Sequence, residues 1–341
     1  MPQDCPGFSP ERWLPALRAL AGLLRLAARD DMQRALATSE VSRAVGQGVG
    51  DLTYALDEAA ENALACWFRE QASAQALSLF SEDRGWLHLG PDGAGGVRQL
   101  PGFDHGGARL MIDPVDGTRN LMADLRSAWS VMSLCGPGAG EPRLVDVQVA
   151  MLAELPDSRA ARYRVLGAER GAGAWIEERE LASDHLVRRA RLVNDGDDRV
   201  DHGYFSFFRY TPCMRPKLAQ IEAQFFACIE QHEAADLRNC FDDQYISNGG
   251  QLVLLALGTY RLIADLRAHL ATQFEVSVTT SKPYDCAGAI LLAQEAGCVV
   301  QDSAGALLDF PLDGSTPVSF VGFANEATAR RLGSHLRTAL G

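Results

Sequence analysis

The segment that most constrains this chain is residues 112–120, which read IDPVDGTRN and follow an apolar run typical of a strand. It delivers two carboxylates, Asp113 and Asp116, to a bend that Pro114 stiffens by fixing its own φ and restraining the residue before it. Magnesium is commonly held by one or two carboxylates together with water and substrate phosphate. If a helix begins after Gly117, its free N–H groups favour an anion at the same place. Alone, however, the segment fits an Asx-type turn equally well.

Two other acidic positions sit at the ends of apolar elements. Glu82 and Asp83 directly follow a predicted strand at residues 76–80, and Asp285 precedes an apolar helix predicted at 286–296. Taken singly, Glu82 could be a solvated loop acid, and Asp285 could simply cap its helix.

Taken together and in this order, the segments resemble the inositol monophosphatase and fructose-1,6-bisphosphatase superfamily over residues 51–326. The motif at 112–120 and the run Tyr284-Asp285-Cys286-Ala287-Gly288 are specific as a pair. The weaker matching pieces are Asp51-Leu52-Thr53 leading to Asp57, Ser81-Glu82-Asp83, Glu295-Ala296-Gly297 and Phe323-Ala324-Asn325.

The resemblance implies a mixed α/β (α+β) fold, a layered αβαβα sandwich of the inositol monophosphatase type, with the site between two halves. It also implies residue roles. Metal ligands would be Glu82, Asp113, the Val115 carbonyl, Asp116 and Asp285; the phosphate would meet Gly117 and Thr118; Asp57, Glu82 and Thr118 would be catalytic; and Ser247, Asn248 and Asp265 would contact the substrate.

The activity implied by the resemblance is that of a Mg²⁺-dependent phosphomonoesterase, using two or three ions to activate the attacking water. The expected substrate is a small sugar, polyol or inositol phosphate. Fructose 1,6-bisphosphate and 3'-phosphoadenosine nucleotides are alternatives within the same chemistry, and a regulatory binding protein of this fold is an alternative of another class. Lithium sensitivity and a homodimer are further expectations from the resemblance.

Several departures from the family pattern affect the substrate rather than the reaction. Asp83 stands where a second glutamate is usual, and Tyr284 stands where a tryptophan is usual. The segment between Asp265 and Asp285 is also longer than expected. Arg267 and Lys282 flank that segment, and they are either solvated surface charges or partners for a second phosphate.

The remaining pattern along the 341 residues alternates helices and strands, which favours a layered arrangement. Predicted helices cover residues 11–36, 56–70, 215–231 and 247–257, and predicted strands cover 110–112, 129–134, 144–151, 260–264, 298–301 and 319–323, with a hairpin at 162–176. Residues 90–107 are predicted as a surface excursion. A charged stretch at 177–201 is predicted to link an N-terminal half, 1–185, to a C-terminal half, 186–341.

The composition limits which kinds of partner the protein is expected to bind. The formal net charge of -12 argues against general nucleic-acid binding, which needs a basic footprint. The sequence shows neither a signal-peptide pattern at its start nor an apolar run long enough to cross a membrane. The eight cysteines form no CxxC pair, so a cytoplasmic protein with reduced thiols is expected.

Overall fold

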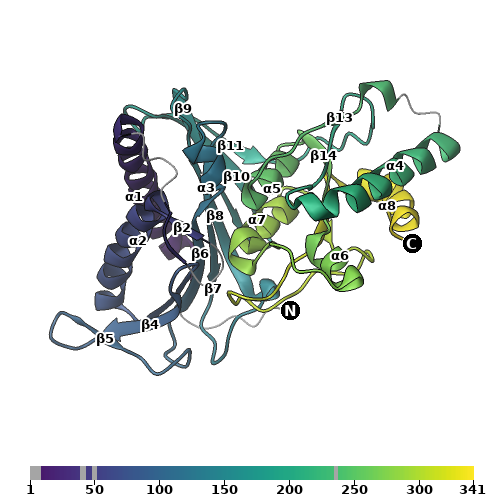
Figure 1. Ribbon diagram of the computed structural model, residues 1–341. Helices are drawn as coiled ribbons and strands as arrows, with labels where there is room; N and C mark the ends of the chain where they lie inside the picture. The colour runs from purple at the N-terminus through teal and green to yellow at the C-terminus, as the bar shows by residue number, and fades with distance from the viewer. Residues whose placement is uncertain (1–8, 39–43, 48–51, 234–236) are drawn as a thin grey trace.

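The computed structural model describes residues 9–38, 44–47, 52–233 and 237–341. Five layers follow one another across the molecule: two helices, a large sheet, two central helices, a small sheet and two outer helices (Figure 1). This is the αβαβα arrangement that the family resemblance implies. Among the described residues, none of the helices combines the length and apolar character that crossing a membrane requires.

The large sheet contains nine strands in the order β11-β10-β9-β8-β7-β6-β3-β4-β5. All neighbours are antiparallel except β3 and β6, which run parallel and so bring Ser81 beside Ile112. Because the two strands are parallel, Glu82 and Asp113, which follow these paired residues, lie at the same end of the strands. The strands are β3 (Leu77–Ser81), β4 (Gly85–Pro91), β5 (Val97–Gln99), β6 (Ala108–Asp116), β7 (Ala128–Cys135), β8 (Val147–Leu155), β9 (Arg162–Glu169), β10 (Gly173–Glu180) and β11 (Leu186–Leu192).

Helices α1 (Pro10–Thr38) and α2 (Ala55–Ala74) cover one face of this sheet. Their buried apolar positions recur at helical spacing, as in Leu17, Leu20 and Leu24 of α1, and pack on β3, β6 and β8. A separate two-stranded ribbon, β1 (Ala44–Gln47) and β2 (Leu52–Tyr54), precedes α2. The short helix α3 (Thr118–Met122) follows β6 directly.

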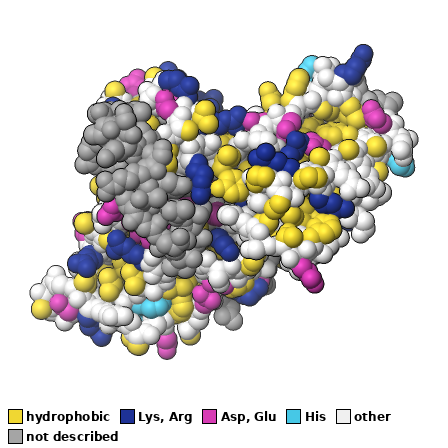
Figure 2. All heavy atoms as spheres, viewed as in Figure 1, with side chains coloured by type: hydrophobic (Ala, Val, Ile, Leu, Met, Phe, Trp, Pro, Cys, Tyr) yellow, Lys and Arg dark blue, Asp and Glu magenta, His cyan; other side chains and the backbone are white. Residues whose placement is uncertain are grey.

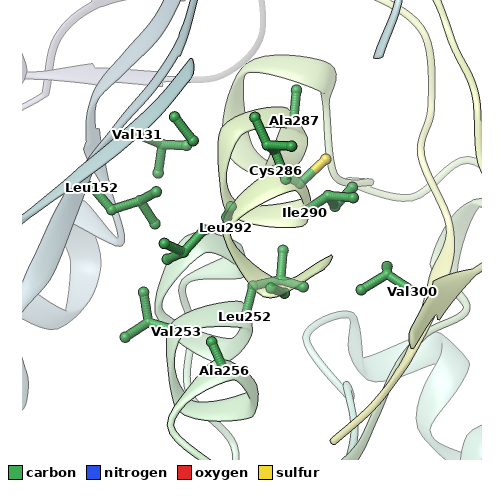
Figure 3. Packing of buried hydrophobic residues seen from close by; sticks show 14 of the residues in the cluster. Val131, Leu152, Leu252, Val253, Ala256, Cys286, Ala287, Ile290, Leu292 and Val300 are labelled. Atoms are coloured by element: carbon green, nitrogen blue, oxygen red, sulfur yellow. The ribbon is translucent and has the colours of Figure 1, made fainter. Parts of the chain in front are cut away.

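The central layer consists of α5 (Asn248–Ala256) and α7 (Pro283–Glu295). Residues 286–293 of α7 are all buried, because the helix lies between two sheets and must be apolar on every side. Figure 3 shows Val131 and Leu152 of the large sheet on one side of these helices and Val300 of the small sheet on the other. Gly288 allows α7 to pack closely against β7, because a Cβ at this position would lie only 2.4 Å from the Met132 carbonyl oxygen.

The small sheet has the order β13-β12-β14-β16-β15 and is covered on its outer face by α4 (Arg215–His232) and α8 (Glu326–Leu340). Its strands are β12 (Tyr204–Phe207), β13 (Phe241–Asp242), β14 (Tyr260–Asp265), β15 (Val299–Gln301) and β16 (Phe320–Phe323). Helix α6 (Arg267–Phe274) follows β14, and short 3-10 turns occupy Leu144–Asp146, Pro212–Met214 and Leu237–Asn239. On the face shown in Figure 2, hydrophobic side chains gather over this C-terminal part.

The predicted elements match the structure closely in the core and less well at its edges. The predicted excursion at 90–107 contains β5, and the predicted link at 177–201 contains β11. Because β11 pairs with β10, the expected division between residues 185 and 186 falls inside the large sheet, and the two halves remain a proposal. Helix α8 was not predicted, although Asn325 caps it by accepting from the Thr328 N–H at 2.8 Å. Asp51, one of the residues that carry the resemblance, lies outside the described residues.

Candidate metal and phosphate site

Three carboxylates converge where β6 ends and α7 begins. Asp113, Asp116 and Asp285 each offer an oxygen, and these oxygens all lie within 4.8 Å of one another. They line a cavity of about 420 Å³. Asp116 and Asp285 are far apart in the sequence but lie close together because α7 packs directly on β6 and β7.

Backbone N–H groups hold each of these carboxylates in place. The Val115 N–H donates to Asp113 Oδ1 at 2.9 Å, and the Lys282 N–H donates to Asp285 Oδ2 at 2.7 Å. Asp116 Oδ2 accepts from the Gly249 N–H at 2.6 Å, at the start of α5. Backbone donors from three parts of the chain therefore hold the trio, and Asp116 accepts an additional hydrogen bond from the Ser247 hydroxyl at 2.7 Å.

Electrostatics makes the trio unfavourable without a cation. Burial, and then the neighbouring carboxylates, raise the pKa of Asp113 well above its usual range. Burial likewise raises the pKa of Asp116 to about 6, although the Ser247 hydroxyl and the Gly249 N–H oppose that rise. Burial and the charge of Asp116 raise the pKa of Asp285 to about 7. An all-oxygen set that resists ionisation by itself fits a hard divalent cation.

Thr118 lies beside the trio at the start of α3. Its hydroxyl is 2.9 Å from Asp57 Oδ1 and 2.8 Å from the Val115 carbonyl oxygen, and its single hydrogen can be donated to either. When Asp57 accepts it, the lone pairs of the hydroxyl remain available to a water. Gly117 precedes it with φ of 96°, a left-handed conformation that glycine adopts readily.

Glu82 completes the acidic side of the cavity, and the Tyr284 hydroxyl donates to its Oε1 at 3.4 Å. Tyr284 itself stacks on Phe80 of β3, with ring centroids 5.8 Å apart. Behind Glu82, buried Glu61 pairs with Arg84 at 3.1 Å and accepts from Ser81 at 3.0 Å. Burial outweighs that pairing and raises the pKa of Glu61 to about 7.

The residues predicted to contact substrate are engaged with the protein. Ser247 donates to Asp116 Oδ2 at 2.7 Å and accepts from the Gly250 N–H at 2.9 Å as the N-cap of α5. The Asn248 side chain donates to Ser281. Both Ser247 and Asn248 line the cavity.

Asp265 is fully buried and does not line the cavity. Both of its oxygens accept from Arg267, at 2.9 and 2.6 Å, and one also accepts from Ser281 at 2.6 Å. Arg267 is 4% exposed and does line the cavity, so it is not a solvated surface charge. Its guanidinium lies over the rings of Phe208 and Tyr210, 4.5 and 5.6 Å from their centroids.

Sequence reasoning missed the aromatic part of the cavity lining. Phe208 and Tyr210 follow β12, and neither carries a local sequence signal for this position. Arg119 also lines the cavity, and the only signal for it was its place in the IDPVDGTRN motif. Lys282, whose amine donates to the Ser315 carbonyl oxygen at 2.8 Å, lines the cavity from the start of α7.

The fold and the acidic site can now be compared with those of known proteins. No protein-family model and no curated protein matches the sequence. Solved structures do match, and they place the chain in the fold of the inositol monophosphatase and fructose-1,6-bisphosphatase superfamily, which confirms the predicted resemblance at the level of the fold.

Three of these structures illustrate the match. Fructose-1,6-bisphosphatase of Leishmania major has a TM-score of 0.68 at 13% identity, covering 96% of this chain and 95% of that chain. A gene product described as an inositol monophosphatase–fructose 1,6-bisphosphatase has a TM-score of 0.62 at 14% identity, covering 96% and 99%. A staphylococcal inositol monophosphatase II with bound inositol monophosphate has a TM-score of 0.55 at 15% identity, covering 95% and 98%.

Proposed function

We propose that the chain is a Mg²⁺-dependent phosphomonoesterase acting on a small hydroxylated phosphate ester. The observation that carries this proposal is the convergence of Asp113, Asp116 and Asp285 in a cavity that also holds the Thr118–Asp57 pair. The activities named for the structural neighbours, on inositol and fructose phosphates, are consistent with it. A homodimer, a cytoplasmic location and lithium sensitivity remain proposals that rest on the resemblance.

In the proposed site, Asp113, Asp116, Asp285, Glu82 and the Val115 carbonyl would hold two or three Mg²⁺ ions. The bound cations would supply positive charge to the phosphoryl oxygens and increase the acidity of water. The protein would do the positioning that phosphoryl transfer mainly requires. Gly117 and Thr118 would donate backbone N–H groups to the phosphate. The Thr118 hydroxyl, donating to Asp57, would accept a hydrogen bond from the attacking water and orient it.

The opposite side of the cavity decides the substrate class. Arg267 carries a positive charge, but Asp265 neutralises it at 2.6 Å, and contacts to Asp265, Thr279 and Ser281 engage all three of its nitrogens. A neutralised pair with little spare donor capacity suits a hydroxyl group better than a second phosphate. We therefore place sugar, polyol and inositol phosphates first.

A bisphosphate, such as fructose 1,6-bisphosphate or a 3'-phosphoadenosine nucleotide, is the second candidate. It is favoured by Arg119 and Lys282, which line the same cavity. Lys282→Ala distinguishes the two candidates. It should weaken binding of a bisphosphate selectively, by raising its KM, and leave a polyol monophosphate, whose alcohol part is uncharged, nearly unchanged.

The proposal is tested by measuring phosphate release from a panel of monoesters with magnesium and with excess chelator. We expect release from at least one polyol or sugar phosphate, its loss in chelator and its return when magnesium is restored. Undiminished turnover in excess chelator, or no release from any ester, would reject a magnesium phosphatase.

A further inference from the structure

A second cavity lies away from the acidic site, between the C-terminal half of α1 and the loop that follows β8. Its volume is about 170 Å³, enough for a small organic molecule rather than a single water. The described residues that line it include the apolar Met32, Leu121 and Leu155 and two arginines, Arg25 and Arg29. One part of the lining is therefore apolar and another is cationic.

Arg25 is the unusual feature of this cavity. It is 5% exposed, and among the residues that the structure describes its Nε and Nη1 atoms have no hydrogen-bond partner and are shielded from solvent. The Tyr163 ring lies 4.3 Å from the guanidinium carbon and covers one face of the group. A buried cationic donor that lacks hydrogen bonds is costly, so this position favours additional negative charge nearby.

The carboxylates near Arg25 offset its positive charge only in part. Asp184 Oδ1 is 3.8 Å from Arg25 Nη2, but its side chain is 59% exposed and also lies 3.6 Å from Arg179. Asp157 lines the cavity, yet it pairs with Arg159 at 3.3 Å. Arg29 stands four residues after Arg25 and therefore on the same face of α1, which adds a second positive charge.

We propose that this cavity binds a small organic carboxylate with an apolar body. A carboxylate in the cavity would place negative charge beside the guanidinium groups of Arg25 and Arg29, which both line it. The body of the ligand would contact Met32, Leu121 and Leu155. The site is distinct from the catalytic cavity, although α3 touches both: Thr118 lines the catalytic cavity and Leu121 lines this one. The proposal does not depend on the phosphatase function.

Isothermal titration calorimetry of the full chain with benzoate tests the proposal, and benzamide serves as the uncharged analogue. We expect saturable binding of benzoate at millimolar concentrations and at least tenfold weaker binding of benzamide. Arg25→Met, which keeps an apolar stem and removes the charge, should weaken benzoate binding at least tenfold. Arg12→Met, which removes an exposed charge from the same helix, should leave it unchanged.

A second variant fills the cavity without touching Arg25. Ala160 lines the cavity from the loop after β8, is partly exposed, and should accept a larger side chain with little damage to the fold. Ala160→Phe should abolish benzoate binding, and thermal melting without ligand would verify that the protein is folded. Absence of saturable binding, or equal benzoate affinity in the wild type and Ala160→Phe, would overturn the proposal whether or not Arg25→Met folds.

Discussion

The cavity that we propose as the active site has two walls that are built in different ways, and we name them after their proposed roles. The metal wall consists of Asp113, Asp116, Thr118 and Asp285, and each of its carboxylates accepts a hydrogen bond from a backbone N–H. The alcohol wall consists of Phe208, Tyr210, Arg267 and Lys282, and side-chain contacts position its central residue, Arg267.

The difference bears on what each wall can tolerate. A main-chain scaffold changes little when side chains around it are replaced, so the metal wall can preserve one chemistry. Side-chain networks are altered by single substitutions, so the alcohol wall can change its substrate without disturbing the metal wall. The comparison predicts that substitutions in the metal wall affect all substrates alike, whereas those in the alcohol wall discriminate between substrates.

The largest expected effect is that of Asp116→Asn. The change keeps the volume of the side chain but removes a charge from the trio, so we expect kcat to fall by about 10²-fold or more on every substrate. Steady-state kinetics on a polyol phosphate and on an aryl phosphate would measure it, with thermal melting to show that the fold persists. Asp104→Asn, at an exposed aspartate, is the matched control. Near-normal turnover in Asp116→Asn would remove Asp116 from the metal wall.

Behind the metal wall, Glu61 predicts a pH dependence of stability. Its pKa is about 7 in the folded chain against 4.5 when unfolded, so the folded state binds the proton more tightly. Its contribution to the free energy of unfolding is therefore greatest below about pH 4.5 and is lost as the pH rises to about 7, by up to about 3 kcal/mol.

Glu61→Gln removes this titration. Urea unfolding at pH 5 and pH 8 should show that the variant gains stability relative to the wild type at the higher pH. Because other titrating groups are shared, they largely cancel in the comparison. A difference between the two proteins that does not change with pH would mean that Arg84 keeps Glu61 ionised throughout.

Ser247 provides a smaller effect that separates two roles. In the structure its hydroxyl donates to Asp116, so Ser247→Ala should lower kcat by about tenfold, the effect of losing one hydrogen bond to a charged group. The loss should be equal for a polyol phosphate and an aryl phosphate. A rise in KM confined to the polyol substrate would instead support the direct substrate contact predicted from the sequence.

The two walls also differ in how far the sequence could predict them. The convergence of Asp113, Asp116 and Asp285 could be expected because their short motifs at element ends, taken together, resemble those of a known superfamily. Taken singly, each motif also fitted a turn or a helix cap, and the role of these residues as metal ligands stays a prediction. The αβαβα layering was implied by the family resemblance, whereas the alternation of helices and strands by itself indicated only a layered arrangement. Edge strands such as β5 and β11 carry weaker patterns and were missed.

The alcohol wall depends on contacts between residues far apart in the sequence. Nothing near Phe208 indicates that its ring lies under Arg267, about sixty residues later. The position of Asp265 was expected to face the substrate, but Arg267, two residues on, engages both of its oxygens. A buried acid two residues from an arginine is a weak signal, because the same spacing is common on exposed surfaces, where such pairs contribute little.

The smallest expected effect concerns this Asp265–Arg267 pair, and a double-mutant cycle would resolve it. If Arg267 contacts the hydroxyls and Asp265 only positions it, Arg267→Met and Asp265→Asn should each raise KM for a polyol phosphate by about fivefold, with kcat little changed, the pattern of lost uniform binding. The double variant should then be no worse than either single variant, because both changes remove the same interaction. An aryl phosphate, which has no hydroxyls to bind, should show little change in any of the three. Multiplying effects in the double variant would show that Asp265 contacts the substrate independently, and the alcohol wall would then include a carboxylate that the structure places behind Arg267.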